Sequence, residues 1–140
     1  MSLLVDTSVW SLALRRDAPH PGPEVEALRQ ALLGTDQVFT TGLILQELLQ
    51  GFAGPKNREV LLHHFSVLAC VQPNRNDHME AAEVRNACRR RGVQIGTIDA
   101  LLIQLCCRHD LTLLSTDQDF SLAAKTIDFR LWRANRAWPG

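Results

Sequence analysis

The sequence predicts an α/β fold: a three-layer α/β/α sandwich around a central parallel sheet of four to five short strands. Two observations predict it. Short apolar runs alternate along the chain with segments of helical periodicity, as in repeated βαβ units. The runs are continuously apolar, which is typical of strands buried on both faces. The 140 residues suit one domain, 1–140, around one hydrophobic core.

The chain opens with a strand followed directly by a helix. Residues 3–6 (LLVD) form an apolar run that ends in an acid. We expect Thr7 or Ser8 to cap a helix over 7–16. Three prolines and a glycine then predict a loop over 17–23.

Two more units follow in the first half of the chain. An amphipathic helix is expected over 24–34, because apolar residues recur with helical spacing and a glycine ends the segment. QVFTT at 37–41 predicts the second strand, and 42–52 a buried helix. Residues 54–65 predict another helix, with a proline near its first turn.

The second half contains the longest helices. Residues 75–92 place acids early and arginines late, which suits the helix dipole. Residues 96–110 are apolar on nearly every side, so this helix is expected to be central, and we expect Thr97 to cap it. A short helix is expected over 118–125. The remaining strands are expected at 66–71, 111–115 and 126–132.

Charge and composition narrow the possible classes of protein. The formal net charge is zero, which argues against nucleic-acid binding through total charge, although a local basic surface stays possible. The sequence contains no run of about 18 apolar residues, so no membrane-spanning helix is predicted. The first residues lack a basic segment typical of signal peptides, so a cytoplasmic protein is expected.

The four cysteines show neither metal-site nor redox-motif spacing. Cys88, Cys106 and Cys107 lie in apolar helical segments. We expect them to be small buried hydrophobic residues rather than ligands or disulfide partners. Trp10 is expected in the core, whereas Trp132 and Trp138 fit a core edge, a partner contact or a base-stacking surface equally well.

Four acids stand where a purely structural role explains them poorly. Asp6 ends the first strand and Asp117 follows the fourth, so both are expected at the edge of the sheet where α/β proteins bind ligands. Glu47 lies at the border of an apolar helical stripe. Asp99 lies on the buried stripe of its helix, where a lone charge costs several kcal/mol.

Each acid also has a structural alternative. Asp6 and Asp117 could cap the helices that follow them, and Asp119 could be a first-turn acid. Glu47 could pair with an arginine at the rim. If the acids converge instead, like charges about 4 Å apart repel by roughly 4 kcal/mol, so the cluster needs protons or a cation. Oxygen ligands without histidine or cysteine suit Mg²⁺ or Mn²⁺, which serve phosphoryl chemistry.

Three segments carry a resemblance to a known family: LLVDTSVW, LQELLQGF and GTIDALLIQLCCRHDLTLLSTDQDF. In this order and spacing, the chain resembles PIN-domain ribonucleases, and more narrowly the VapC-type toxins of bacterial toxin–antitoxin pairs. The resemblance implies a small α/β/α fold and metal-dependent endoribonuclease activity that leaves a 5′-phosphate and a 3′-hydroxyl.

The resemblance also implies roles for individual residues. Asp6, Glu47, Asp99 and Asp117 match the metal-binding acids, with Glu47 acting directly or through water, and Asp119 matches an accessory acid. Hydroxyl positions that support the acids match Thr7, Ser8 and Thr116. We expect arginines near the rim to contact RNA phosphates, namely Arg15, Arg16, Arg108 and Arg130.

The implied partners are an RNA substrate, a cognate antitoxin encoded beside the chain, and a second copy of the chain in a homodimer. The rival hypothesis is a binding module with the same fold and no catalysis. Its signature would be the loss of one acid, and all four are present.

Overall fold

A computed structural model describes residues 1–15 and 22–134 of the chain. The strands, in chain order, are β1 (Ser2–Val5), β2 (Gln37–Thr40), β3 (Ala69–Cys70), β4 (Thr112–Leu114) and β5 (Arg130–Leu131). The helices are α1 (Thr7–Leu14), α2 (Pro23–Leu33), α3 (Gly42–Gly51), α4 (Pro55–Phe65), α5 (Arg75–Arg90), α6 (Thr97–His109) and α7 (Gln118–Ala123).

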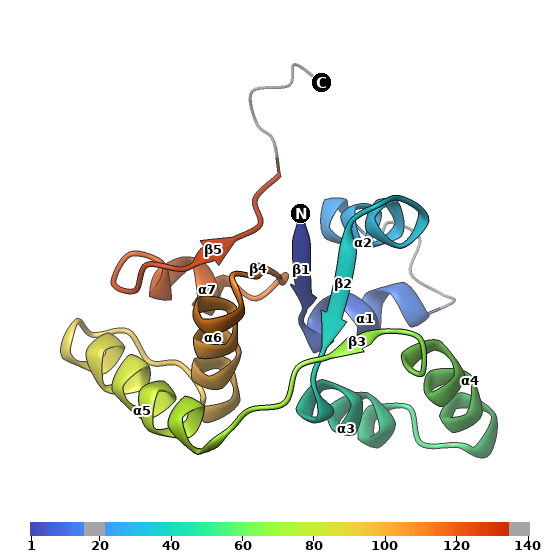
Figure 1. Cartoon of the computed structure of the whole chain (residues 1–140), viewed down its shortest axis with the longest axis horizontal. Helices are drawn as coiled ribbons and strands as arrows, with labels where there is room; N and C mark the ends of the chain where they lie inside the picture. The colour runs from blue at the N-terminus through green and yellow to red at the C-terminus, as the bar shows by residue number, and fades with distance from the viewer. Residues whose placement is uncertain (16–21, 135–140) are drawn as a thin grey trace.

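All strands pair in parallel, in the order β3-β2-β1-β4-β5. Connections between parallel strands are almost always right-handed. The chain moves outward from β1 to β3, which places α1 to α4 on one face, and then reverses to β4 and β5, which places α5 to α7 on the other. Figure 1 shows these two groups of helices on opposite sides of the sheet. The predicted three-layer α/β/α fold is confirmed.

The reversal creates the feature that positions the site. β1 and β4 are neighbours, with Val5 opposite Leu114, yet the chain leaves them toward opposite edges of the sheet. A crevice forms outside the carboxyl ends of two such strands, and ligands of α/β proteins bind there. Asp6 and Asp117 follow these two strands, so the strand order alone brings them to this crevice.

The strands are shorter than predicted. β3 and β5 have two residues each, whereas 66–71 and 126–132 were expected to be strands, because only edge pairings with β2 and β4 hold them. Two helix caps also differ from the prediction. Asp6 is the N-cap of α1, in place of Thr7 or Ser8, and Gly96 is the N-cap of α6, in place of Thr97. The predicted loop 17–23 falls mostly outside the described residues, and its last proline begins α2.

The core lies between the sheet and both helical layers. The strands β1 and β4 bury nearly all their side chains, and α6 buries six residues along its length, as its apolar sequence predicted. Trp10 is 5% exposed and packs against Phe65, with ring centroids 4.9 Å apart. Cys88 and Cys106 are buried as expected, but Cys107 is exposed, because it lies on the outer face of α6.

None of the described helices combines the length and the apolar content needed to cross a bilayer.

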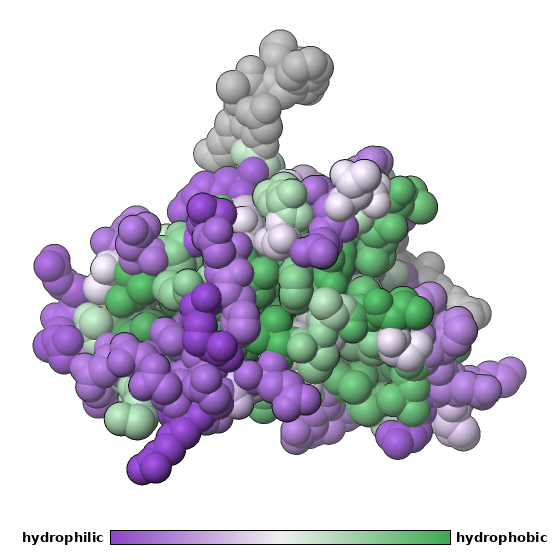
Figure 2. All heavy atoms as spheres, viewed as in Figure 1, coloured by the Kyte–Doolittle hydropathy of each residue, from purple (hydrophilic) through white to green (hydrophobic). Residues whose placement is uncertain are grey.

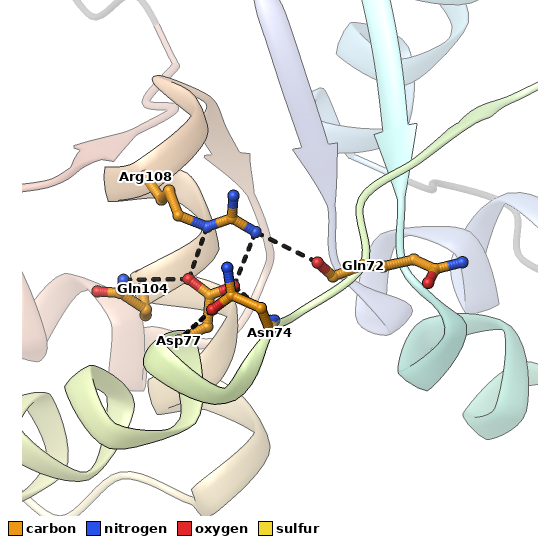
Figure 3. Close-up of polar contacts among 5 residues, drawn as sticks. All are labelled: Gln72, Asn74, Asp77, Gln104 and Arg108. Atoms are coloured by element: carbon orange, nitrogen blue, oxygen red, sulfur yellow. Dashed lines mark hydrogen bonds and ion pairs between the residues drawn. The ribbon is translucent and has the colours of Figure 1, made fainter.

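A buried ion pair locks α5 to α6. Asp77 is fully buried in the first turn of α5, and Arg108 near the end of α6 donates to both of its oxygens, at 2.7 and 2.8 Å. Arg108 also donates to the carbonyl of Gln72 at 3.2 Å, and Gln104 to Asp77 at 3.3 Å. The backbone N–H of Asn74 donates to the same carboxylate, which completes a capping box. Figure 3 shows Asn74, Gln104 and Arg108 around Asp77, with Arg108 also reaching Gln72.

This network compensates the cost of burying a carboxylate. Burial by itself raises the pKa of Asp77, and the hydrogen bonds from Arg108, Asn74 and Gln104 overcome it, so that the pKa lies below its usual value. An acid with a lowered pKa contributes stability above its unfolded pKa of 3.8, and this contribution is lost as the pH falls through the folded value.

Replacing Arg108 with Gln should therefore destabilise the protein by about 3 kcal/mol, because the charge of Asp77 stays buried without its cation. The matched control is Arg130→Gln, which removes an exposed pair with Asp110 and should cost less than about 1 kcal/mol. Urea denaturation at pH 7 measures both. Equal stabilities of the two variants would contradict the role given to Arg108.

Candidate metal and catalytic site

The centre of the site is the junction between β1 and β4. The backbone N–H of Asp6 donates to the carbonyl of Leu114 at 2.9 Å, which extends the parallel pairing one residue beyond β1. Asp6 and the turn after β4 are therefore fixed relative to each other by the sheet itself. The carboxylate of Asp6 is 8% exposed, so this charge is largely removed from water.

Two serine hydroxyls hold the Asp6 carboxylate. Ser8 Oγ and Ser115 Oγ both donate to Asp6 Oδ2, at 2.8 and 2.7 Å. The same carboxylate makes no capping hydrogen bond to α1, although Asp6 is the N-cap by position. The simple capping role therefore does not account for this side chain.

The serines also shape the turn that carries Asp117. Ser115 Oγ accepts from the backbone N–H of Asp117 at 3.0 Å, and Ser8 Oγ accepts from the backbone N–H of Thr116 at 3.1 Å. Thr116 thus joins the network through its backbone. Sequence reasoning missed Ser115, which follows a buried strand directly and faces Asp6 only because β1 and β4 are neighbours.

Glu47, on α3, is outside the group of three clustered acids and is joined to the residue that follows Asp6. Thr7 Oγ1 donates to Glu47 Oε1 at 2.9 Å, which joins the first residue of α1 to the middle of α3. Glu47 is half-buried, and within the described ranges it forms no ion pair with an arginine. The rim-pair alternative for Glu47 therefore finds no support in the described part of the chain.

Three acids come closest together. Asp99, Asp117 and Asp119 each place a carboxylate oxygen within 4.8 Å of the other two. Asp99 projects from the first turn of α6, and Asp117 caps α7 by accepting from the backbone N–H of Asp119 at 2.9 Å. The capping alternative for Asp117 is thus real, but it coexists with the cluster.

The surroundings of Asp99 disfavour its charge. Burial raises the pKa of Asp99 to about 6, and the negative charges of Asp6, Asp117 and Asp119 act in the same direction. A long hydrogen bond of 3.4 Å from the backbone N–H of Gly96 opposes them without offsetting them. Asp99 therefore senses all three neighbouring aspartates, which shows that Asp6 belongs to the same electrostatic group.

This donor set fits a hard divalent cation. The converging atoms are all carboxylate oxygens, the ligands that Mg²⁺ and Mn²⁺ take. Over residues 1–15 and 22–134, no lysine, arginine or histidine forms an ion pair with these acids. The repulsion that raises the pKa of Asp99 is therefore a charge imbalance that a bound cation would relieve.

Two of the predicted RNA-contacting arginines, Arg108 and Arg130, are engaged with other acids. Arg108 is engaged with Asp77, and it lies about 14 Å along α6 from Asp99 at 1.5 Å per residue. Arg130 pairs with Asp110 beside the start of β4, at the opposite edge of the sheet. Neither position supports the predicted contact, because the guanidinium of Arg108 is engaged in the buried network around Asp77 and Arg130 lies at the start of β5. Arg15 is exposed after α1, and Arg16 lies outside the described residues.

Solved structures share this fold. The VapBC2 structure from Rickettsia felis, bound to a DNA fragment from its promoter, contains a chain with a TM-score of 0.76 and 16% identity, over 96% of this chain and 100% of that chain. FitAcB from Neisseria gonorrhoeae gives a TM-score of 0.70 and 22% identity, over 94% and 96%. VapC20 of Mycobacterium tuberculosis is described as a sarcin-ricin loop cleaving toxin. It gives a TM-score of 0.65 and 22% identity, over 91% of this chain and 98% of that chain.

No curated protein sequence matches the chain. The PIN domain family matches it over residues 3–126, which includes all five acids discussed above. The resemblance drawn from the sequence motifs is thereby confirmed at the level of the family. This chain belongs to the PIN domain family.

Proposed function

We propose that this protein is a Mg²⁺- or Mn²⁺-dependent endoribonuclease and the VapC-type toxin of a toxin–antitoxin pair. The observation that carries the proposal is the convergence of Asp99, Asp117 and Asp119 at the switch point of the sheet without a compensating cation among the described residues. A bound divalent ion would supply water activation and stabilisation of the leaving oxygen during phosphodiester hydrolysis.

The residues of the chain would bind the ion and fix the orientation of its ligands. Asp99, Asp117 and Asp119 would hold the ion, with Asp6 beside them and Glu47 directly or through water. Ser8 and Ser115 fix the orientation of Asp6, and Thr7 fixes Glu47. Such supporting hydrogen bonds set ligand geometry before the ion binds, which is what distinguishes a prepared site from a chance group of acids.

The toxin assignment rests on the structural relatives. Two of them are VapBC2 and FitAcB, and a third is described as a sarcin-ricin loop cleaving toxin. We therefore propose that the chain acts in the cytoplasm and pairs with a cognate antitoxin protein. The catalytically silent binding module stays the alternative, but the complete set of acids does not favour it.

The surface favours self-association of the chain. Figure 2 shows apolar residues gathered over the half of this face that contains α2, α3 and α4, whereas polar residues cover much of the half with α5. Large apolar side chains are exposed on this half of the fold: Leu32, Leu33, Val60, Leu62 and Val67. Contiguous apolar surface of this kind marks protein interfaces, so we propose a homodimer.

The purified protein should cleave single-stranded RNA with Mg²⁺ or Mn²⁺, and EDTA should stop the reaction until metal is restored in excess. The physical reason is the all-oxygen donor set. Gel analysis of a labelled RNA measures the cleavage. An Asp117→Asn preparation, purified in the same way, controls for contaminating nucleases, and undiminished cleavage in EDTA would refute the metal requirement.

Asp99→Asn should abolish cleavage and leave the melting temperature in EDTA at pH 7.5 equal to or above that of the wild type. A raised folded pKa means that Asp99 contributes stability below its unfolded value of 3.8, and this contribution is lost as the pH rises through about 6. The advantage of the variant should therefore shrink at pH 5, where Asp99 is mostly protonated in the folded wild type.

The same variant should gain less stability from saturating Mg²⁺ or Mn²⁺ than the wild type, because ions stabilise the state that binds them. Asp128→Asn, at an exposed acid before β5, is the control and should leave the metal-dependent gain unchanged. A variant at Asp99 that still cuts RNA, or that melts well below wild type in EDTA, would make Asp99 a structural acid.

Light scattering at micromolar concentrations should give twice the mass of one chain. Val60→Lys should lower it toward the monomer, because a charge would be buried on the apolar face of α4. Met79→Lys, at an exposed apolar position on α5, should leave the dimer intact. A monomeric mass for the wild type would overturn the proposed assembly.

A further inference from the structure

A cavity of about 860 Å³ adjoins the acid cluster. It shares Asp117 with that cluster and continues over α7 toward the segment that follows β5. Its volume falls within the range of about 300–1,000 Å³ that is typical of small-molecule sites. Its polar and aromatic lining includes Thr116, Asp117, Gln118, Ser121, Trp132 and Arg133.

Trp132 lines this cavity, and its backbone is held by the sheet. Its backbone N–H donates to the carbonyl of Leu113 at 2.8 Å, so the residue continues the pairing of β5 with β4. Its side chain is half-buried and packs partly against the core. Because β4 leads directly into the turn that carries Asp117, the sheet sets the position of the indole relative to the acids.

The cavity also carries groups that suit a flat, polar ring. Arg133 is the only basic residue that lines it among the described residues, and it stands on the same segment as Trp132. Gln118 and Glu24 supply an amide and a carboxylate, which accept from or donate to the edges of nucleobases. Leu122 and Leu131 add apolar walls.

We propose that this cavity binds a nucleobase of the RNA substrate next to the scissile phosphate, with Trp132 as its stacking surface. The inference rests on the proposed nuclease function, because the acids define where the scissile phosphate lies. Single-stranded RNA is recognised through unstacked bases that pack on aromatic side chains and arginine planes. The acid cluster cannot read sequence, so a base-binding cavity beside it is where a preference among nucleotides would arise.

The first test needs no cleavage and no metal. Wild-type protein in EDTA is titrated with each of the four ribonucleosides and with ribose, and the tryptophan indole N–H signals are followed by NMR. Each signal is assigned by a tryptophan-to-phenylalanine variant. Nucleosides carry no phosphate, so repulsion by the acids does not oppose their binding.

The Trp132 signal should shift and saturate with at least one nucleoside, but not with ribose. The Trp10 signal should stay in place, since this indole is buried in the core. An unmoved Trp132 signal, or equal shifts with nucleoside and ribose, would overturn the proposal. An unmoved signal would instead favour a segment of a protein as the ligand of this cavity.

The second test uses variants at position 132. Stacking of a base on an aromatic ring predicts a loss of about 5- to 150-fold in kcat/KM for Trp132→Leu, which keeps apolar bulk without the ring. Trp132→Phe should stay within about threefold of the wild type, because the ring is kept. Equal losses in both variants would contradict stacking.

The two proposals fail separately. A protein that cleaves RNA but shows no nucleoside-dependent shift keeps its nuclease function and loses the base site. A protein that binds nucleosides at Trp132 but never cleaves RNA keeps the base site and loses the nuclease function.

Discussion

The structure depends on the repulsion among carboxylates that the parallel pairing of β1 with β4 brings together. Neighbouring strands that leave in opposite directions open a crevice, and their first residues beyond the sheet are Asp6 and the turn that carries Asp117. α6 then adds Asp99 from its first turn. This arrangement is costly, since burial and then the negative charges of Asp6, Asp117 and Asp119 raise the pKa of Asp99.

The contrast with Asp77 separates a compensated acid from an uncompensated one. Asp77 is more deeply buried than Asp99, yet its pKa is lowered, because Arg108 and two further donors compensate its charge. Asp99 has only one long hydrogen bond against three negative neighbours. Helix α6 takes part in both arrangements. At its carboxyl end Arg108 compensates the charge of Asp77, and at its amino end Asp99 has no cationic partner among the described residues. The compensated end fixes the helix, and the uncompensated end is suited to receive a cation.

A hydroxyl network links the acids of this edge to one another. Ser8 follows β1 and Ser115 follows β4, and both hydroxyls donate to one oxygen of Asp6 at the carboxyl edge of the sheet. Each serine also accepts from the turn after β4, which ties the position of Asp117 to that of Asp6. Thr7 ties α3 into the same network through Glu47. The polar contacts thus hold the acids in place, and the cavity with Trp132 extends from this rigid edge.

The sequence by itself determined the fold class, and it singled out the four acids as candidates. Continuous apolar runs such as LLVD and LTLLS can only be buried strands, and an acid such as Asp99 on a buried helical stripe has few structural explanations. These features are local, so that composition and periodicity reveal them. The same local reasoning misplaced the caps of α1 and α6, because neighbouring polar residues compete for one position and the backbone path decides between them.

Only the tertiary structure decided which residues meet. Ser115 is an ordinary serine after a strand until β4 is placed beside β1, and then it holds Asp6. Arg108 is a plausible phosphate contact from its place near the end of a helix, but Asp77, 31 residues away, engages it. Trp132 could not be assigned from the sequence, and the pairing of β5 with β4 brings it to the cavity beside Asp117. Contacts of this kind join residues far apart in the chain, and the strand order that creates them is not written in any local pattern.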